Sequence, residues 1–180
     1  MELLDLRKEI IQDLRADLPE LVDKFNHFLL KSLPSKKNSV VLLSFNKKTL
    51  NLPRECVVKI FRTENGDKEV QVLKKLKKQN LYVPDVLFYK EPYLILEKVD
   101  GINVCDFINE KLVDIKSLDD LDEKNKDEID NCVTKLASWL AKLHVNNTLS
   151  QDSNICVLNK GDTRLRDFVF NPQTNTIYGM

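Results

Sequence analysis

The chain has few of the residues that build several common functional sites. Its 180 residues include four glycines, four cysteines, two histidines and one tryptophan. No Cys-x-x-Cys occurs and the two histidines are far apart, so the ligand spacing of a zinc site is missing. All four cysteines stand in apolar contexts, which predicts reduced core residues in a cytoplasmic protein.

Long apolar runs and an excess of charge of one sign are also missing. The 28 Lys and Arg balance the 28 Asp and Glu, which argues against a broad attraction to nucleic acid or to an anionic membrane. No apolar run approaches the roughly 18–20 residues that span a bilayer. The first residues lack the basic segment and apolar core of a signal peptide. The length predicts one globular domain, which can comprise two lobes.

Hydrophobic periodicity predicts an α+β chain. Residues 3–33 repeat every 3.6 residues, which predicts two helices broken near Asp17. Residues 39–45 and 56–61 are β-branched runs that predict two neighbouring strands. The remaining expected elements are a helix over 68–79, strands over 83–89 and 93–97, a short helix capped by Asn103, a solvated acidic connector over 114–128, a long amphipathic helix to 144 and two short strands near the end.

The last 22 residues carry the most specific pattern in the chain. Gly161-Asp162 is followed five residues later by Asp167, another residue that can bind a metal. The apolar trio 168–170, a turn and a short apolar run come next. This order resembles the catalytic loop of the kinase-like phosphotransferases, which include aminoglycoside and choline phosphotransferases and atypical protein kinases. The resemblance covers residues 39–180.

The resemblance implies a protein-kinase-like, bilobal α+β fold. Residues 1–33 would form an N-terminal helical segment, 34–99 a small lobe with an antiparallel sheet, and 100–180 an incomplete helical C-terminal lobe. The family pattern would continue beyond Met180 with a second metal-binding aspartate, so we expect little activity from these 180 residues alone. We also expect an under-covered apolar face on helix 125–144, which would favour self-association.

The resemblance also implies an ATP-dependent phosphotransferase that uses Mg²⁺. Lys59 would contact the nucleotide phosphates, and Glu69 would pair with its ammonium group. Asp162 would engage the acceptor hydroxyl, which belongs to a small molecule or a protein, and Asp167 would bind the metal. The other nucleotide-binding positions that the resemblance implies are Val57, Glu97, Val99 and Val169.

Each of these residues also has a purely structural interpretation. Lys59 could be an edge-strand lysine that points to solvent. Glu69 could be a first-turn glutamate favoured by the helix dipole. Asp162 and Asp167 could belong to a charged surface loop. Spacing and neighbouring motifs favour the functional interpretation.

Three departures from the family pattern favour a second hypothesis. Residues 34–58 contain no glycine, although a glycine-rich phosphate loop is expected there. Lys160 stands where the family has histidine, and Asp167 where it usually has asparagine. The chain would then be a pseudokinase or a regulatory nucleotide- or protein-binding module without catalysis. A third hypothesis is a helical interaction protein that uses residues 1–33.

Two arginines in the same loop have two possible roles. Arg164 and Arg166 flank Leu165. A guanidinium group matches the geometry of a phosphate or carboxylate, so either arginine could contact a substrate. Either could equally neutralise Asp162 and Asp167 without any substrate. The sequence does not separate these roles.

Overall fold

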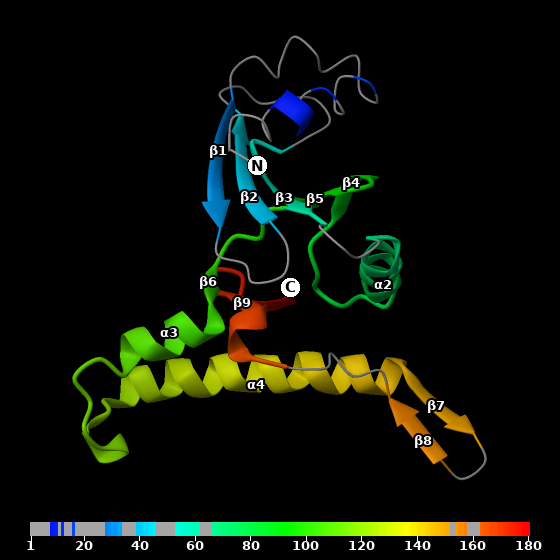
Figure 1. Ribbon diagram of the computed structural model, residues 1–180. Coiled ribbons are helices and arrows are strands. Elements are labelled where there is room, and N and C mark those ends of the chain that lie inside the picture. The colour runs from blue at the N-terminus through cyan, green and yellow to red at the C-terminus, as the bar shows by residue number, and fades with distance from the viewer. Residues whose placement is uncertain are drawn as a thin grey trace. The chain divides into compact units, whose positions relative to one another are not determined.

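The structure is a computed structural model. It describes residues 8–10, 12, 16, 28–33, 39–45, 53–61, 66–151, 154–157 and 163–180 (Figure 1). The chain divides into two compact units. The first comprises Met1–Lys74 and Asp85–Lys98, and the second comprises Lys75–Pro84 and Val99–Met180. No helix among the described residues is long and apolar enough to cross a membrane.

The first unit is built on a five-stranded antiparallel sheet with the strand order β1-β2-β3-β5-β4. Its strands are β1 (Phe28–Leu33), β2 (Ser39–Phe45), β3 (Glu55–Ile60), β4 (Val86–Lys90) and β5 (Tyr93–Glu97). Helix α2 (Asp67–Lys78) follows β3 in the chain. The two β-branched runs predicted to be neighbouring strands are β2 and β3, which pair with Val41 opposite Val58. That prediction is confirmed.

Strand β1 overturns part of the helical prediction for residues 3–33. Residues 28–33 form a strand, and all six pair with β2, beginning with Phe28 opposite Phe45. The helix propensities of ordinary residue types differ by less than about 1 kcal/mol per residue. Hydrogen bonding to an existing sheet edge can therefore override a local preference for helix. Elsewhere in this segment the described residues are few but helical: 8–10, 12 and 16.

Ile10 belongs to the core of the first unit. Ile10 is only 1% exposed and lies among buried side chains of β2, β3 and β5. Nearby, the Tyr93 hydroxyl donates a hydrogen bond to the Glu9 carboxylate at 3.2 Å. The buried partners of Ile10 are Val41, Leu43, Cys56, Val58, Ile60, Tyr93 and Ile95. These contacts argue against the third hypothesis, in which the N-terminal segment acts as a separate interaction module.

The second unit combines helices with two small sheets. Helices α3 (Val104–Lys111) and α4 (Glu123–Asn146) run beside each other (Figure 1). One antiparallel sheet has the order β10-β9-β6, from β6 (Ile102–Asn103), β9 (Phe168–Asn171) and β10 (Thr176–Gly179). The other elements are the 3-10 turns η2 (Leu118–Asp120) and η3 (Leu165–Asp167) and a hairpin of β7 (Thr148–Gln151) and β8 (Asn154–Val157). The hairpin was not predicted.

Helix α4 starts earlier than the sequence pattern suggests. Residues 123–128 are helical, although 114–128 read as a solvated connector. Asp122 is the reason, because its side chain caps the helix by accepting the Asn125 backbone N–H at 2.9 Å. This hydrogen bond lowers the pKa of Asp122. Glu123 adds a favourable negative charge in the first turn.

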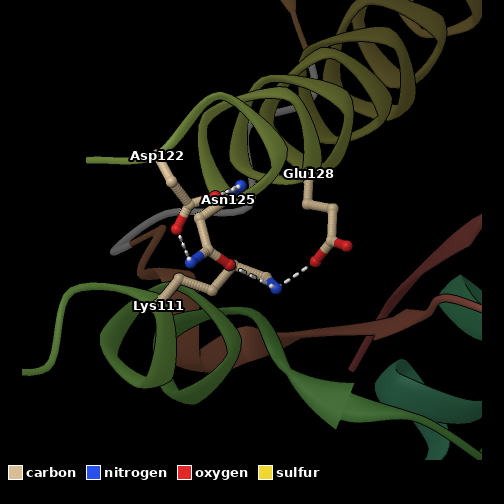
Figure 2. Close-up of polar contacts among 4 residues, drawn as sticks. All are labelled: Lys111, Asp122, Asn125 and Glu128. Carbon is tan, nitrogen blue, oxygen red and sulfur yellow. Dashed lines mark hydrogen bonds and ion pairs between the residues drawn. The ribbon is translucent and has the colours of Figure 1, made fainter.

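The same helix start is tied to α3 by a charged contact (Figure 2). Lys111, near the end of α3, forms an ion pair with Glu128 of α4 and donates to the Asn125 side chain at 3.4 Å. The Asn125 amide in turn donates to Asp122 at 2.7 Å. The Lys111 ammonium also lies 4.7 Å from the centre of the Phe107 ring. Residues that read as a solvated acidic stretch therefore help to join two helices.

Trp139 organises the centre of the second unit. Its indole N–H donates to the Tyr82 carbonyl at 3.0 Å, and the Gly179 N–H donates to the same carbonyl at 3.1 Å. The Trp139 and Phe168 rings meet edge to face, with centroids 5.4 Å apart. A Cβ at position 179 would lie 2.4 Å from the Trp139 ring, so this position requires glycine. The close approach fixes β10 against α4.

The predicted apolar face of α4 is mostly covered within the second unit. Its buried side chains are Cys132, Leu136, Trp139 and Leu143. Val133, on the flank of that face, is exposed. The expected under-covering is therefore confined to the flank, and self-association stays a prediction.

Three of the four cysteines are free thiols in the described part of the structure. Cys56 and Cys132 are buried and Cys105 is half-buried. Burial raises the pKa of Cys56 to about 12 and that of Cys132 to about 11. These two thiols are therefore protonated at neutral pH, as expected for core cysteines.

Truncating Ile10 should destabilise the first unit. Ile10→Ala removes a buried side chain from the core, and we expect a loss of about 2–4 kcal/mol in the free energy of unfolding. Urea denaturation followed by circular dichroism measures this loss. Val145→Ala, at an exposed position of α4, is the control and should change stability by less than about 0.5 kcal/mol. Equal effects of the two substitutions would contradict a core role for the N-terminal residues.

Candidate active site

Lys59 and Glu69 form an ion pair within the first unit. The alternation of β3 places Cys56, Val58 and Ile60 in the core, so Lys59 projects from the opposite face of the sheet. Glu69 stands in the first turn of α2. The side chains are 23% and 34% exposed, respectively. The predicted pairing is confirmed, and the alternative of an edge-strand lysine is wrong because β3 lies between β2 and β5.

The Lys59–Glu69 ion pair fixes the position of the Lys59 ammonium group more than it stabilises the fold. Ion pairs that are partly exposed contribute about 0.2–1 kcal/mol to folding. Across the strands, Lys59 lies opposite Val40 and Leu94, and its ammonium is 5.0 Å from the Phe61 ring centre. The flexible lysine side chain is thus restrained on one face of the sheet. A restrained ammonium group is suited to binding an anionic group such as a phosphate.

The predicted nucleotide-binding residues of the first unit lie near one another in the register of the sheet. Val57 is two residues from Lys59 and therefore lies on the same face of β3, opposite Leu96. Glu97 ends β5, and its backbone N–H donates to the Asp85 carbonyl at 2.9 Å. The Glu97 carboxylate also accepts the Asp85 N–H at 3.2 Å. The backbone N–H and the carboxylate of Glu97 thus both form hydrogen bonds with Asp85.

A charged cluster beside this strand end was not predicted. The Lys98 ammonium pairs with Glu55 at 2.6 Å, and the Ser44 hydroxyl donates to the same carboxylate at 3.1 Å. These bonds, the one from Lys98 above all, lower the pKa of Glu55. Only the strand register could reveal the cluster, because Glu55 begins β3 while Lys98 follows β5. The cluster fixes the end of β5 next to Glu97.

The remaining predicted positions belong to the second unit. Val99 follows directly on the first unit. Val169 is in β9, opposite Asn103 of β6 and Tyr178 of β10. Asp167 ends the turn η3. Since these three residues and the Lys59–Glu69 pair lie in different units, their roles at a shared nucleotide site stay predictions.

Asp167 is held by Arg164 and by Met180. Its two carboxylate oxygens accept from the backbone N–H and the guanidinium of Arg164, each at 3.3 Å. The Asp167 N–H donates to the Arg164 carbonyl and the Met180 N–H donates to the Asp167 carbonyl, both at 2.9 Å. Asp167 is thus fixed in place at the end of η3 and offers hard oxygen atoms of the kind that Mg²⁺ prefers.

Other parts of the predicted catalytic loop cannot be placed. Asp162, with Lys160 and Gly161, lies outside the described residues. Among the residues that the structure describes, no group of three or more His, Cys, Asp or Glu side chains gathers as a metal site. Asp167 is therefore the single predicted metal ligand whose surroundings are known.

His144 contributes its backbone carbonyl to the end of α4. It stands in the last turn of α4, where its carbonyl accepts the backbone N–H of Asn147 and the hydroxyl of Thr148 at 3.1 and 2.7 Å. Asn147 is buried and exchanges side-chain hydrogen bonds with Gln79, at 2.9 and 3.1 Å. These contacts end α4 and attach it to the segment after α2.

Comparison with known proteins identifies the fold and not the family. No family model matches the sequence, and no curated protein does either. Among solved structures, the fold of this chain resembles that of an ethanolamine kinase over 84% of its length. The α+β architecture with an antiparallel five-stranded sheet thus resembles part of an ethanolamine kinase fold, which agrees with the fold that the sequence resemblance implied.

Two solved structures show this similarity. An ethanolamine kinase from Plasmodium vivax superimposes with a TM-score of 0.54 at 14% sequence identity. The match covers 84% of this chain and 36% of that one. A choline kinase from Cryptosporidium parvum matches with a TM-score of 0.40 at 14% identity, over 84% of this chain and 63% of that one. The chain therefore spans about a third of the length of the ethanolamine kinase.

The charged cluster at the end of β5 should be visible in a pH titration. Lys98→Met removes the strongest influence on Glu55, so we expect the pKa of Glu55 to rise toward the ordinary value of about 4.3. Carbon-13 NMR of the Glu55 carboxyl group measures this pKa. Lys74→Met, at an exposed position of α2, is the matched control and should leave it unchanged.

The lowered pKa of Glu55 determines how the stabilisation by this cluster changes with pH. Stabilisation by this cluster is present above the unfolded-state pKa of about 4.3 and is lost as the pH falls through the lower folded-state value. The Lys98→Met chain should therefore lose less stability than the unaltered chain between pH 5 and about pH 3. A Glu55 pKa that stays unchanged in Lys98→Met would contradict the assignment.

Proposed function

We propose that this chain provides the nucleotide-binding part of an ATP-dependent, kinase-like phosphotransferase. The observation that carries the proposal is the Lys59–Glu69 ion pair, which links the central strand of the five-stranded antiparallel sheet to the first turn of α2. The similarity to the ethanolamine kinase fold supports it independently, because it rests on the backbone and not on these two side chains. In this proposal residues 34–99 form the N-terminal lobe and residues 100–180 begin the C-terminal lobe, although residues 75–84 and Val99 belong to the second compact unit.

In this proposal Lys59 binds the phosphates and Glu69 orients its ammonium group. Phosphoryl transfer depends mostly on placed charges, so a restrained cation beside the phosphates is a direct contribution to catalysis. Val57 and Val169 would each contact the adenine, as the family resemblance implies. Because the Glu97 N–H already binds Asp85, Val99 is the residue whose backbone would supply a hydrogen-bond donor to the base.

Mg²⁺ and the acceptor would be bound by the catalytic loop. Mg²⁺ usually keeps several waters and takes only one or two carboxylates besides the substrate phosphates, so a single ligand such as Asp167 fits this chemistry. The bound ion would neutralise charge on the phosphates. Asp162 would orient the acceptor hydroxyl and accept its proton. The acceptor is a small molecule or a protein, and the fold does not decide between them.

A non-catalytic nucleotide-binding module is the second candidate. The lack of glycine in residues 34–58, Lys160 and Asp167 favour it. Both candidates require nucleotide binding at Lys59, whereas only the first requires phosphoryl transfer. The two are therefore separated by a second measurement after binding has been established.

Nucleotide binding should depend on Lys59. At ten times its Kd, MgATP should raise the melting temperature of the chain by about 3–6 °C. Lys59→Ala removes a charge-assisted contact worth about 1.5–3 kcal/mol, so ATP should bind roughly 10- to 100-fold more weakly. Glu69→Gln should cause a smaller loss, because the ammonium group remains but is less well oriented. Titration calorimetry measures these affinities.

Lys74→Ala is the control for Lys59→Ala. Lys74→Ala removes an exposed lysine from α2 and should leave ATP affinity unchanged. If neither ATP nor GTP stabilises the chain, or if Lys59→Ala binds ATP as the unaltered chain does, the nucleotide-binding proposal is wrong. If ATP binds, phosphate transfer to ethanolamine, the first acceptor to test, or to water that disappears in Asp162→Asn supports the enzyme. Binding without any Asp162-dependent turnover is the result expected of the non-catalytic module, and also of a phosphotransferase that needs the second metal-binding aspartate of the family pattern.

A further inference from the structure

The two arginines of the catalytic loop differ in their contacts. Arg164 binds Asp167 through both its guanidinium and its backbone N–H. Arg166 is exposed and makes no ion pair with any described residue, while its carbonyl accepts from the Asn103 amide at 2.7 Å. The sequence assigned both arginines the same two possible roles. The structure separates them, because Arg164 forms an ion pair with the predicted metal ligand and Arg166 does not.

Arg164 contacts both carboxylate oxygens of Asp167, which are the atoms that a cation would bind. Each carboxylate oxygen of Asp167 faces an N–H group of Arg164. A divalent cation such as Mg²⁺ binds carboxylate oxygen at about 2.0–2.1 Å and would be repelled by a guanidinium group at the same oxygen. The side chain of Asp167 is 22% exposed and that of Arg164 is 55% exposed, so the guanidinium has room to move into solvent.

The guanidinium contact is weak enough to be displaced. Its length of 3.3 Å exceeds the roughly 2.7–2.9 Å of a strong charge-assisted hydrogen bond. The backbone of the turn does not depend on it. Asp167 is held by hydrogen bonds from its own N–H to Arg164 and from the Met180 N–H to its carbonyl. Moving the Arg164 side chain therefore leaves the carboxylate in position.

We infer that Arg164 is an internal counter-ion of Asp167, which a divalent cation displaces when it binds. This inference rests on the proposed function, because that function makes Asp167 a metal ligand. In the metal-free chain Arg164 stabilises η3 and neutralises the carboxylate. On metal binding the guanidinium is released, and it is then free to contact an anionic group of the nucleotide. The arrangement weakens metal binding in the absence of nucleotide.

The test compares Mn²⁺ binding to the full chain and to variants at neighbouring arginines. Electron paramagnetic resonance of free Mn²⁺ gives the affinity without any assay of turnover. Arg164→Gln should bind Mn²⁺ about two- to fivefold more tightly than the unaltered chain, which is the size expected for loss of a partly exposed ion pair. Arg166→Gln is the matched control, because it removes an equal charge two residues away, and it should change the affinity by less than about 1.5-fold.

A second measurement separates this role from a structural one. Arg164→Gln should lower the melting temperature of the metal-free chain by a few degrees at most, while it raises Mn²⁺ affinity. A residue that only supported the fold would lower stability without tightening metal binding. Arg164→Lys keeps the charge but not the planar fork, so its Mn²⁺ affinity should lie between those of the unaltered chain and Arg164→Gln.

If Arg164→Gln does not bind Mn²⁺ more tightly, Asp167→Ala shows whether the counter-ion role or the metal role has failed. Loss of Mn²⁺ binding in Asp167→Ala, together with equal affinities of Arg164→Gln and the unaltered chain, overturns the counter-ion role and leaves the metal role intact. If neither the unaltered chain nor Arg164→Gln shows Mn²⁺ binding that depends on Asp167, the metal role fails as well, and the inference with it. Binding that appears only in Arg164→Gln supports the counter-ion role in its strongest form.

Discussion

The alternation of side chains along β3 is the constraint on which the first unit depends. Cys56, Val58 and Ile60 project into the core from one face of the sheet, so Lys59 must project from the other. The same strand lies between β2 and β5, and the buried face therefore cannot shift without breaking pairing on both sides. Sheet stability and the position of the Lys59 ammonium are thus set by one register.

A single backbone carbonyl has a comparable role in the second unit. The Tyr82 carbonyl accepts from the Trp139 indole and from the Gly179 N–H, so it joins α4 to the last strand. That strand pairs with β9, which begins directly after Asp167. The position of the predicted metal ligand therefore depends on packing around Trp139 and on a glycine that leaves room for its ring. Packing residues thus determine where this candidate site residue lies.

Much of the fold was predictable because local patterns and tertiary structure agree. The strands β2, β3 and β5 and the helix α2 follow from periodicity, and Asn103 caps α3 as expected. Failures occurred where tertiary contacts override local preference. Residues 28–33 read as helix but pair with a sheet edge. Residues 123–128 read as a solvated connector but begin α4, because Asp122 caps that helix and Lys111 binds Glu128.

The sequence by itself determined the residue types available for chemistry and their order along the chain. It indicated a lysine in a strand, a glutamate at the next helix start and aspartates in a late loop, because chemical character and spacing are local properties. Tertiary structure alone decided which of these groups meet. It paired Lys59 with Glu69 and attached Arg164, not Arg166, to Asp167. Such choices depend on distances between segments brought together by folding, which no linear pattern records.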